Sequence, residues 1–210
     1  EYVLGAAALG EDPPQWDAAE RHFKAAVENA PTMLRAQFRL ARMHAARGGM
    51  PEAIAVLERM LQAAPDHERA KALLATLSQR LAREQEKTSK AAHEELIGRA
   101  DRLRETDRAE RALELYKRAI AMDSTEPRGY TGLGWCYLDL DRRDEAVAMF
   151  RKAIQHAPGA ADPTMGLAEA YRLKGSEREA LKYYRAYLEL APKGPEAAVA
   201  RRMIEQMTRE

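Results

Sequence analysis

The stretch that decides the fold is EPRGYTGLGWCYLDLDRRDEAVAMFRKAIQHAPG, residues 126–159, which is followed directly by AADPTMGLAEAYRLKGSEREALKYYRAYLELAPK, residues 160–193. The two segments align without a gap at a shift of 34 residues. Residues of the same kind then coincide at six positions: Leu133 with Leu167, Gly134 with Ala168, Tyr137 with Tyr171, Ala146 with Ala180, Phe150 with Tyr184, and Pro158 with Pro192. A repeat of this length is typical of a helical array.

Within one repeat, the spacing of apolar residues predicts two helices separated by the polar turn DRRD, residues 141–144. One face of each helix carries the apolar and small residues, which are Tyr130, Leu133, Gly134 and Tyr137 in the first helix and Ala146, Phe150 and Ala153 in the second. Pro158 ends the second helix because proline cannot continue the hydrogen-bond ladder. We therefore expect antiparallel hairpins, with Phe150 filling the space between neighbours.

This ladder resembles the tetratricopeptide repeat (TPR), whose signature is Trp, Leu, a small residue, Tyr, Ala, Phe and Pro. Three weaker copies precede it, with matches at Ala19, Phe23, Ala26 and Pro31, then at Leu40, Ala41, Ala53, Leu57 and Pro65, and then at Ala100, Leu103, Ala112, Tyr116 and Ala119. The resemblance implies an all-α fold, a right-handed superhelix (α-solenoid) of antiparallel helix hairpins whose first helices line a concave groove. It also implies a role in binding other proteins.

The repeats predict four segments along the chain. These are an N-terminal sub-array of about two repeats plus an extra helix (1–83), a polar connector (84–92), a C-terminal sub-array of three repeats (93–194) and a capping helix (195–210). The connector is open to two interpretations, a continuous helix or a helix end followed by a loop. Residues 66–97 contain no Gly or Pro, which favours the helix. In the capping helix, Pro195 is the expected first residue, and Val199, Met203 and Met207 should cover the last repeat.

Composition excludes several classes of protein. The 34 Lys and Arg residues nearly balance the 33 Asp and Glu residues, so nothing in the net charge calls for nucleic acid. No apolar run approaches the roughly 18 residues that a membrane span needs. Cys136 is the single cysteine and cannot form an internal disulfide.

The chain begins with Glu1 rather than Met, inside an apparent helix. We therefore expect it to be a fragment of a larger protein, and its richness in Arg and Ala suggests a GC-rich bacterial genome. A cytoplasmic location is expected. A periplasmic one stays an alternative, because a signal segment could precede Glu1.

Trp135 lies about 150° around its helix from the centre of the core stripe, and we expect it to project into the groove. The expected C-terminal partner-binding surface comprises Ile97, Asp101, Arg128, Thr131, Gly132, Trp135, Leu138, Asp139, Met165, Glu169 and Arg172, with Arg104 and Asp162 beside them. Glycines recur on this face at Gly98, Gly132 and Gly166. One interpretation is a groove floor kept low for a partner. The other is that the glycines ease helix packing and that Trp135 leans onto neighbouring helices.

A second candidate surface lies on the first helices of the N-terminal sub-array. It comprises Arg35, Phe38, Arg39 and Arg42, followed by Arg69, Thr76 and Arg80. Arginines on one side of a helix can bind carboxylates bidentately. Family members that capture a terminal carboxylate use Lys and Asn at equivalent places, and these are absent here. The alternative is a solvated face neutralised by Glu28 and Glu68.

No catalytic, metal-binding or cofactor-binding residues are expected. The five histidines are scattered without metal-ligand spacing, and no serine lies in a GxSxG motif. Gly129, Gly132 and Gly134 follow no strand and lack a Gly-Lys-Ser/Thr, so they do not form a phosphate loop. Cys136 is expected to be a small buried apolar residue.

These observations predict a non-catalytic adaptor that binds a peptide, a helix or a small folded domain such as a GTPase. A bacterial secretion, pilus, motility or polarity complex is the expected setting, by association only. Two alternatives stay open, the substrate-recognition arm of a larger enzyme and a lipid-anchored, pilotin-like assembly factor. Self-association through 84–92 or the N-terminal end is a further alternative.

Overall fold

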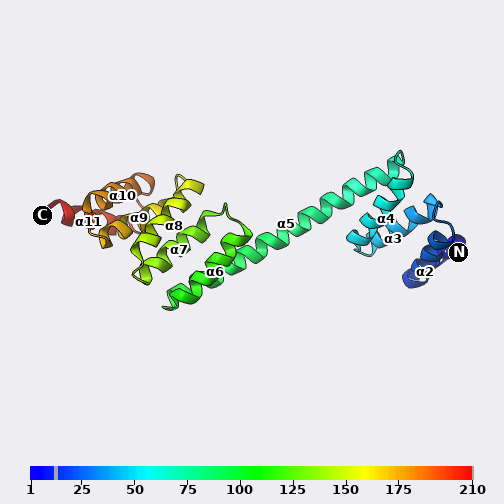
Figure 1. Ribbon diagram of the computed structural model, residues 1–210, viewed down its shortest axis with the longest axis horizontal. Helices are drawn as coiled ribbons and strands as arrows, with labels where there is room; N and C mark the ends of the chain where they lie inside the picture. Colours follow the sequence, from blue (N-terminus) through cyan, green and yellow to red (C-terminus); the bar gives the residue numbers. More distant parts are fainter. Residues whose placement is uncertain (12–13, 210) are drawn as a thin grey trace. The chain divides into compact units, whose positions relative to one another are not determined.

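The computed structural model describes residues 1–11 and 14–209. Asp12 and Pro13 of the expected first turn, and Glu210 at the end of the expected capping helix, lie outside the described residues. The described residues form α-helices paired in sequential hairpins, which confirms the predicted all-α fold (Figure 1). In chain order the helices are α1 (Tyr2–Leu9), α2 (Trp16–Asn29), α3 (Leu34–Ala46), α4 (Met50–Ala63), α5 (Glu68–Glu105), α6 (Ala109–Met122), α7 (Pro127–Asp139), α8 (Arg143–His156), α9 (Ala161–Leu173), α10 (Glu177–Leu190) and α11 (Ala197–Arg209).

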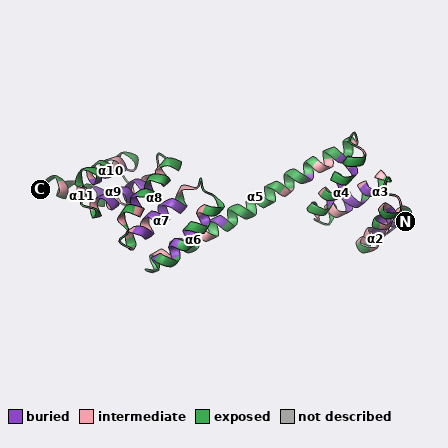
Figure 2. Ribbon diagram, viewed as in Figure 1, coloured by how far each residue is buried: buried purple, intermediate pink, exposed green. Residues whose placement is uncertain are grey.

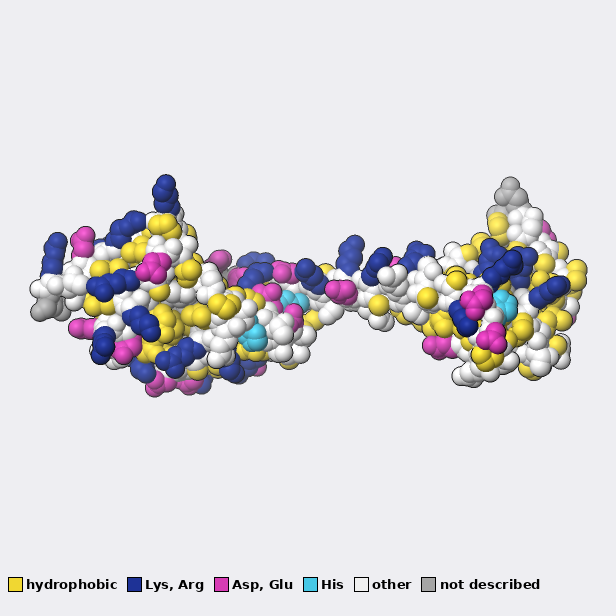
Figure 3. Space-filling view, turned by 90° about the horizontal axis from the view of Figure 1, so that it is seen from above, with side chains coloured by type: hydrophobic (Ala, Val, Ile, Leu, Met, Phe, Trp, Pro, Cys, Tyr) yellow, Lys and Arg dark blue, Asp and Glu magenta, His cyan; other side chains and the backbone are white. Residues whose placement is uncertain are grey.

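The chain divides into two compact units, unit 1 (Glu1–Thr88) and unit 2 (Ser89–Glu210). Helix α5 contributes its first turns to unit 1 and its last turns to unit 2, and it is continuous over 38 residues. The expected connector, 84–92, is therefore helix rather than loop. Residues 82–92 are all exposed (Figure 2), and Lys, Arg, Asp and Glu side chains project from the middle segment in the space-filling view (Figure 3). The middle of α5 is helical without a core of its own.

The turn inside each complete hairpin follows one rule. Its middle residue has a left-handed backbone, with φ of 84° at Gly48, 56° at Asp107, 58° at Asp141 and 72° at Gly175. In each turn, the N–H three residues beyond the last helical residue bonds back to a carbonyl five residues earlier, as from Arg142 to Tyr137 at 2.7 Å. This is the Schellman arrangement, in which Gly or Asp meets the conformational demand. These four turns therefore reverse the chain in the same way.

The predicted ladder forms the core. The alanines that face a neighbouring helix are fully buried, as at Ala112, Ala146 and Ala180. Small residues at these positions let backbones approach, and the aromatic one turn later fills the space beside them. That residue is Tyr116, Phe150 or Tyr184, each at most 1% exposed.

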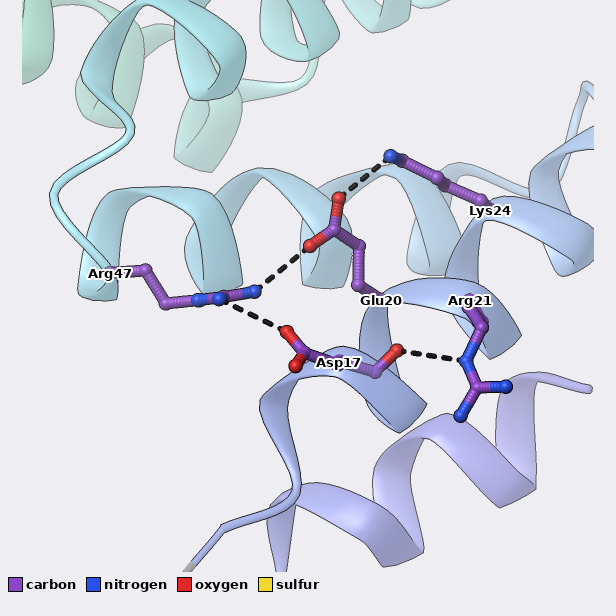
Figure 4. A network of polar contacts seen from close by, with 5 residues as sticks. All are labelled: Asp17, Glu20, Arg21, Lys24 and Arg47. Carbon is purple, nitrogen blue, oxygen red and sulfur yellow. Dashed lines mark hydrogen bonds and ion pairs between the residues drawn. The ribbon is translucent and has the colours of Figure 1, made fainter.

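Polar contacts also join the hairpins of unit 1. Arg47, at the end of α3, pairs with Asp17 at 3.1 Å and with Glu20 at 2.9 Å, both on α2 (Figure 4). Lys24 pairs with Glu20 one turn along α2, at 2.7 Å. The cluster ties the second helix of one hairpin to the first helix of the next, although its exposed members make it a modest contribution to stability.

The final helix differs in detail from the prediction. Helix α11 begins at Ala197, and Pro195 lies in the preceding turn. Its most deeply buried residues are Ala197 and Ala200, whereas Val199 is exposed and does not cover the last repeat as expected. Met203 and Met207 do pack against the core.

Candidate partner-binding surface

Two adjoining hollows lie on the first helices of unit 2. The first, of about 250 Å³, is formed by the last turns of α5, by α7 and by the start of α9. The second, of about 520 Å³, extends from α7 and α9 to the turn before α11. Arg104, Trp135 and Asp162 line both hollows. Trp135 therefore stands at the boundary between them.

Trp135 is half-buried, and its position combines the two interpretations offered by the sequence. Its ring meets the ring of Phe150 edge-on, with centroids 5.2 Å apart and planes at 75°. Its indole N–H donates to Asp162 Oδ1 at 2.9 Å. Trp135 thus leans on the next helix and still presents part of its surface to the hollows. Two contacts from different helices hold the indole in one orientation.

Trp135 belongs to a repeat position that contacts the aromatic residue of the second helix. In the preceding repeat Asp101 occupies it and accepts a hydrogen bond from the Tyr116 hydroxyl at 2.5 Å. In the following repeat Glu169 occupies it and accepts one from the Tyr184 hydroxyl. Only the middle repeat replaces this acid–tyrosine pair with two aromatic rings. The apolar part of the surface is therefore concentrated at Trp135.

The glycines do not form a low groove floor. A Cβ atom on Gly132 would lie 2.2 Å from the Tyr116 ring, and one on Gly166 would lie 2.3 Å from the Phe150 ring. Each glycine makes room for the aromatic of the preceding repeat, so the packing interpretation holds for both. Gly98 differs, because only the Arg102 guanidinium lies near its Cβ position, at 3.6 Å.

Besides Gly132, three residues predicted for the groove are buried. Ile97 is 1% exposed, Met165 is 2% exposed and Thr131 is 7% exposed, and they occupy one repeat position. The Thr131 hydroxyl donates to the Pro127 carbonyl at 3.0 Å. Thr131 lies on α7 and Met165 on α9, and these two helices contact each other. Met165 is a core residue that lines neither hollow, whereas Ile97 and Thr131, although almost fully buried, form part of the lining of the first hollow.

The remaining predicted residues lie at or near the surface. Arg128 is exposed and pairs with Glu94 at 2.8 Å and with Asp101 at 3.8 Å. Arg172 pairs with Glu169 at 2.7 Å. Leu138 packs partly against the core. Most of the charge on this face is thus already paired within unit 2.

Arg104 is the exception among these cations. Its nearest carboxylate oxygen among the described residues is on Asp139, at 4.0 Å. Partial desolvation raises the pKa of the Asp139 carboxyl although Arg104 opposes the shift. The Arg104 guanidinium lines both hollows and can take a further hydrogen-bond acceptor.

Sequence reasoning missed the far wall of the second hollow. Tyr187, Ala191, Pro195 and Glu196 form this wall, and the Glu196 N–H donates to the Tyr187 hydroxyl at 3.2 Å. Burial raises the pKa of the Glu196 carboxyl, and Asp162 and Glu169 raise it further. No sequence motif predicts this wall, because it forms only when the turn before α11 folds back over α10.

Cys136 is fully buried in the core of unit 2, as expected. Burial raises the pKa of its thiol to about 12, so it stays protonated at neutral pH. Within residues 1–11 and 14–209, no group of three or more potential metal ligands is found. In the same part of the chain, no helix is both long and apolar enough to cross a membrane.

The second predicted surface lies in unit 1. Arg35, Arg39 and Arg42 are exposed on α3, and Arg69 and Arg80 are exposed on α5. Phe38 is half-buried among them, and its ring lies 5.5 Å from that of His67.

Comparison with known families agrees with this architecture. One tetratricopeptide repeat model matches residues 14–77, and a second matches residues 97–161 and 131–195. The chain is a tetratricopeptide repeat protein. Such repeats are typically non-catalytic modules that bind other proteins. A search of curated proteins gives no match.

Solved structures similar to this tetratricopeptide repeat protein include SycD, the type III secretion translocator chaperone of Yersinia enterocolitica, in an alternative dimer. It is 20% identical, with a TM-score of 0.54 over 56% of this chain and 92% of that chain. The TPR2AB domain of yeast Sti1, in a pHSP90 complex, is 17% identical, with a TM-score of 0.53 over 97% and 83%. The first TPR of Spaghetti (RPAP3), bound to the HSP90 peptide SRMEEVD, is 20% identical, with a TM-score of 0.53 over 56% and 96%. At these identities the likeness shows the fold.

Proposed function

We propose that this protein is a non-catalytic adaptor that binds a segment of a partner protein on the first helices of unit 2, with Trp135 as the main apolar contact. The observation that carries the proposal is the fixed, half-exposed indole between two hollows, held by Phe150 and Asp162. Tryptophan residues that are held rigid and partly exposed are common energetic centres of interfaces.

The size of the hollows favours a segment over a whole folded domain. Volumes of about 250 and 520 Å³ accommodate individual side chains of a peptide or helix. Two structural neighbours, the Sti1 domain and the RPAP3 repeat, were solved with HSP90 or its peptide. They support this kind of ligand, although not its sequence.

The charges beside Trp135 specify the ligand further. Arg104 has room for a carboxylate, and the carboxyl groups of Asp162 and Glu196 line the second hollow with it. The best fit is a segment with an apolar side chain over Trp135, an acidic residue toward Arg104 and a basic residue toward Asp162. Such mixed charge fixes direction and register more than it adds affinity.

The test is a selection of displayed random peptides on the intact chain, followed by affinity measurements for the selected peptides. We expect Trp135→Ala to weaken binding by at least about tenfold, the usual loss at an interface centre. Leu190→Ala is the matched control, because it removes another exposed apolar side chain from unit 2, on α10. Circular dichroism should show that both variants are folded.

Equal binding by the wild type and Trp135→Ala would reject this surface as the recognition site. A parallel capture from cell lysate, with the same variants, would identify the partner. Its identity would decide among the proposed settings, a secretion, pilus, motility or polarity complex.

A further inference from the structure

We propose that unit 1 carries a second protein-binding site of different chemistry, in which the arginine face formed by Arg35, Arg39, Arg42, Arg69 and Arg80 binds an acidic segment of a partner. The site lies in the other unit and shares no residue with the hollows beside Trp135. It therefore goes beyond the function proposed above.

The first observation is that charge is sorted between the helices of unit 1. Helix α3 contains three arginines and no Asp or Glu, whereas α2 and α4 carry the acidic residues of their hairpins, beginning with Asp17 and Glu52 in their first turns. Residues 1–88 nevertheless contain twelve basic and twelve acidic residues. Unit 1 is therefore neutral as a whole, but the electrostatic potential at its arginine face is positive.

The second observation is that the arginine face is unpaired. Among the described residues, none of its five guanidinium groups lies within 4.0 Å of a carboxylate oxygen. Neither acid of the alternative interpretation, Glu28 or Glu68, forms an ion pair with these arginines, and Glu68 pairs with Lys71 at 2.9 Å. Arg47 shows the contrast, since it is held by two acids of α2 (Figure 4).

The spacing of the arginines fits a regular ligand. Arg35 and Arg39 are about 6 Å apart along the helix axis, and Arg42 lies about 4.5 Å further. Acidic side chains four residues apart on a helix, or two apart on an extended chain, have a similar spacing. Phe38, packed on His67, offers an apolar contact among these charges. A ligand with acids on one edge and an apolar residue between them would match all of these features.

A protein segment is favoured over nucleic acid or a membrane surface. Nucleic acids and anionic membranes are bound mainly through many phosphate contacts, which usually requires a domain with net positive charge. Unit 1 has no net positive charge. Arginine instead binds carboxylates bidentately, with a preference for defined geometry. The face is small and directional, as a short acidic segment requires.

The probe is a synthetic helical peptide with glutamates four residues apart and a leucine between them, labelled for fluorescence anisotropy against the intact chain. We expect the triple variant Arg35→Gln/Arg39→Gln/Arg42→Gln to bind at least about tenfold more weakly than the wild type. The matched control is Arg21→Gln/Lys24→Gln/Arg59→Gln, which removes three exposed cations from α2 and α4 and should change binding by less than about twofold. Glutamine is a good helix former, so both variants should fold.

An equal loss in both triple variants would overturn the proposal, because it would show a response to net charge alone. Undiminished binding in the first variant would also overturn it. So would tighter binding of single-stranded DNA, or of vesicles of phosphatidylcholine and phosphatidylserine, with the same dependence on the three arginines. Trp135→Ala should bind this peptide like the wild type, which separates failure of this site from failure of the site on unit 2.

Discussion

Gly98 and Gly132 occupy the same repeat position, yet their surroundings are opposite. The ring of Tyr116 covers Gly132, whereas Gly98 is open because α5 runs on in place of a preceding second helix. Packing therefore requires a glycine at Gly132 but not at Gly98, although the two recur at the same repeat position. The reason for a glycine at this repeat position is the aromatic ring of the preceding repeat. Gly98 belongs to the first repeat of its array and has no such ring against it.

The largest effect should come from removing the ring that reaches across two hairpins. Phe150 is fully buried and lies against Gly134, Gly166 and Trp135. We expect Phe150→Ala to lower the free energy of unfolding by about 4 kcal/mol, through lost burial and the cavity left behind. Urea denaturation followed by circular dichroism measures this. A loss below about 1 kcal/mol would mean that the ring does not hold the hairpins together.

Filling a glycine beneath a ring should have the next largest effect. Gly132→Ala places a methyl group against the Tyr116 ring, and we expect a loss of about 2 kcal/mol by overpacking. Gly166→Ala should behave alike because of Phe150. In a Phe150→Ala background, Gly166→Ala should cost nothing, which a double-mutant cycle tests. Additive losses would contradict the packing explanation.

The opposite sign is expected at the open glycine. Gly98→Ala should raise the free energy of unfolding by about 0.5–1 kcal/mol, because alanine favours a helix interior and meets only the flexible end of Arg102. The same denaturation experiment applies. Destabilisation there would show that something else requires a glycine at Gly98.

The smallest effect depends on pH. The pKa of Glu196 is raised in the folded protein, so the folded state holds its proton to a higher pH than the unfolded state. Stability therefore falls as pH rises through the folded pKa. Glu196→Gln should melt at a higher temperature than the wild type at pH 7, and the difference should vanish below about pH 4, where both states are protonated. An equal gain at both pH values would point to a cause other than ionisation.

Much of the fold could be predicted because the same residue types recur at the positions where the helices of each repeat contact one another. Ala112, Ala146 and Ala180 are all buried, and the hairpins follow from them. The candidate surface was predicted less well, since a helical wheel describes one helix without its neighbours. Met165 was expected on the surface but is a core residue, and Ile97, which lines the first hollow, is only 1% exposed. Glu196 was missed because its place depends on a turn that no local pattern encodes.

The exposed middle of α5 has a consequence for heritable variation. Residues 82–92 contact no core, so a change there is felt mainly through helix propensity, usually within about 0.5 kcal/mol. Codons for this stretch can drift among good helix formers, with Gly and Pro selected against. A side chain at Gly166 is tolerated only if the ring at Phe150 becomes smaller. Related genes should therefore diverge fastest in 82–92 while keeping the length of that stretch helical.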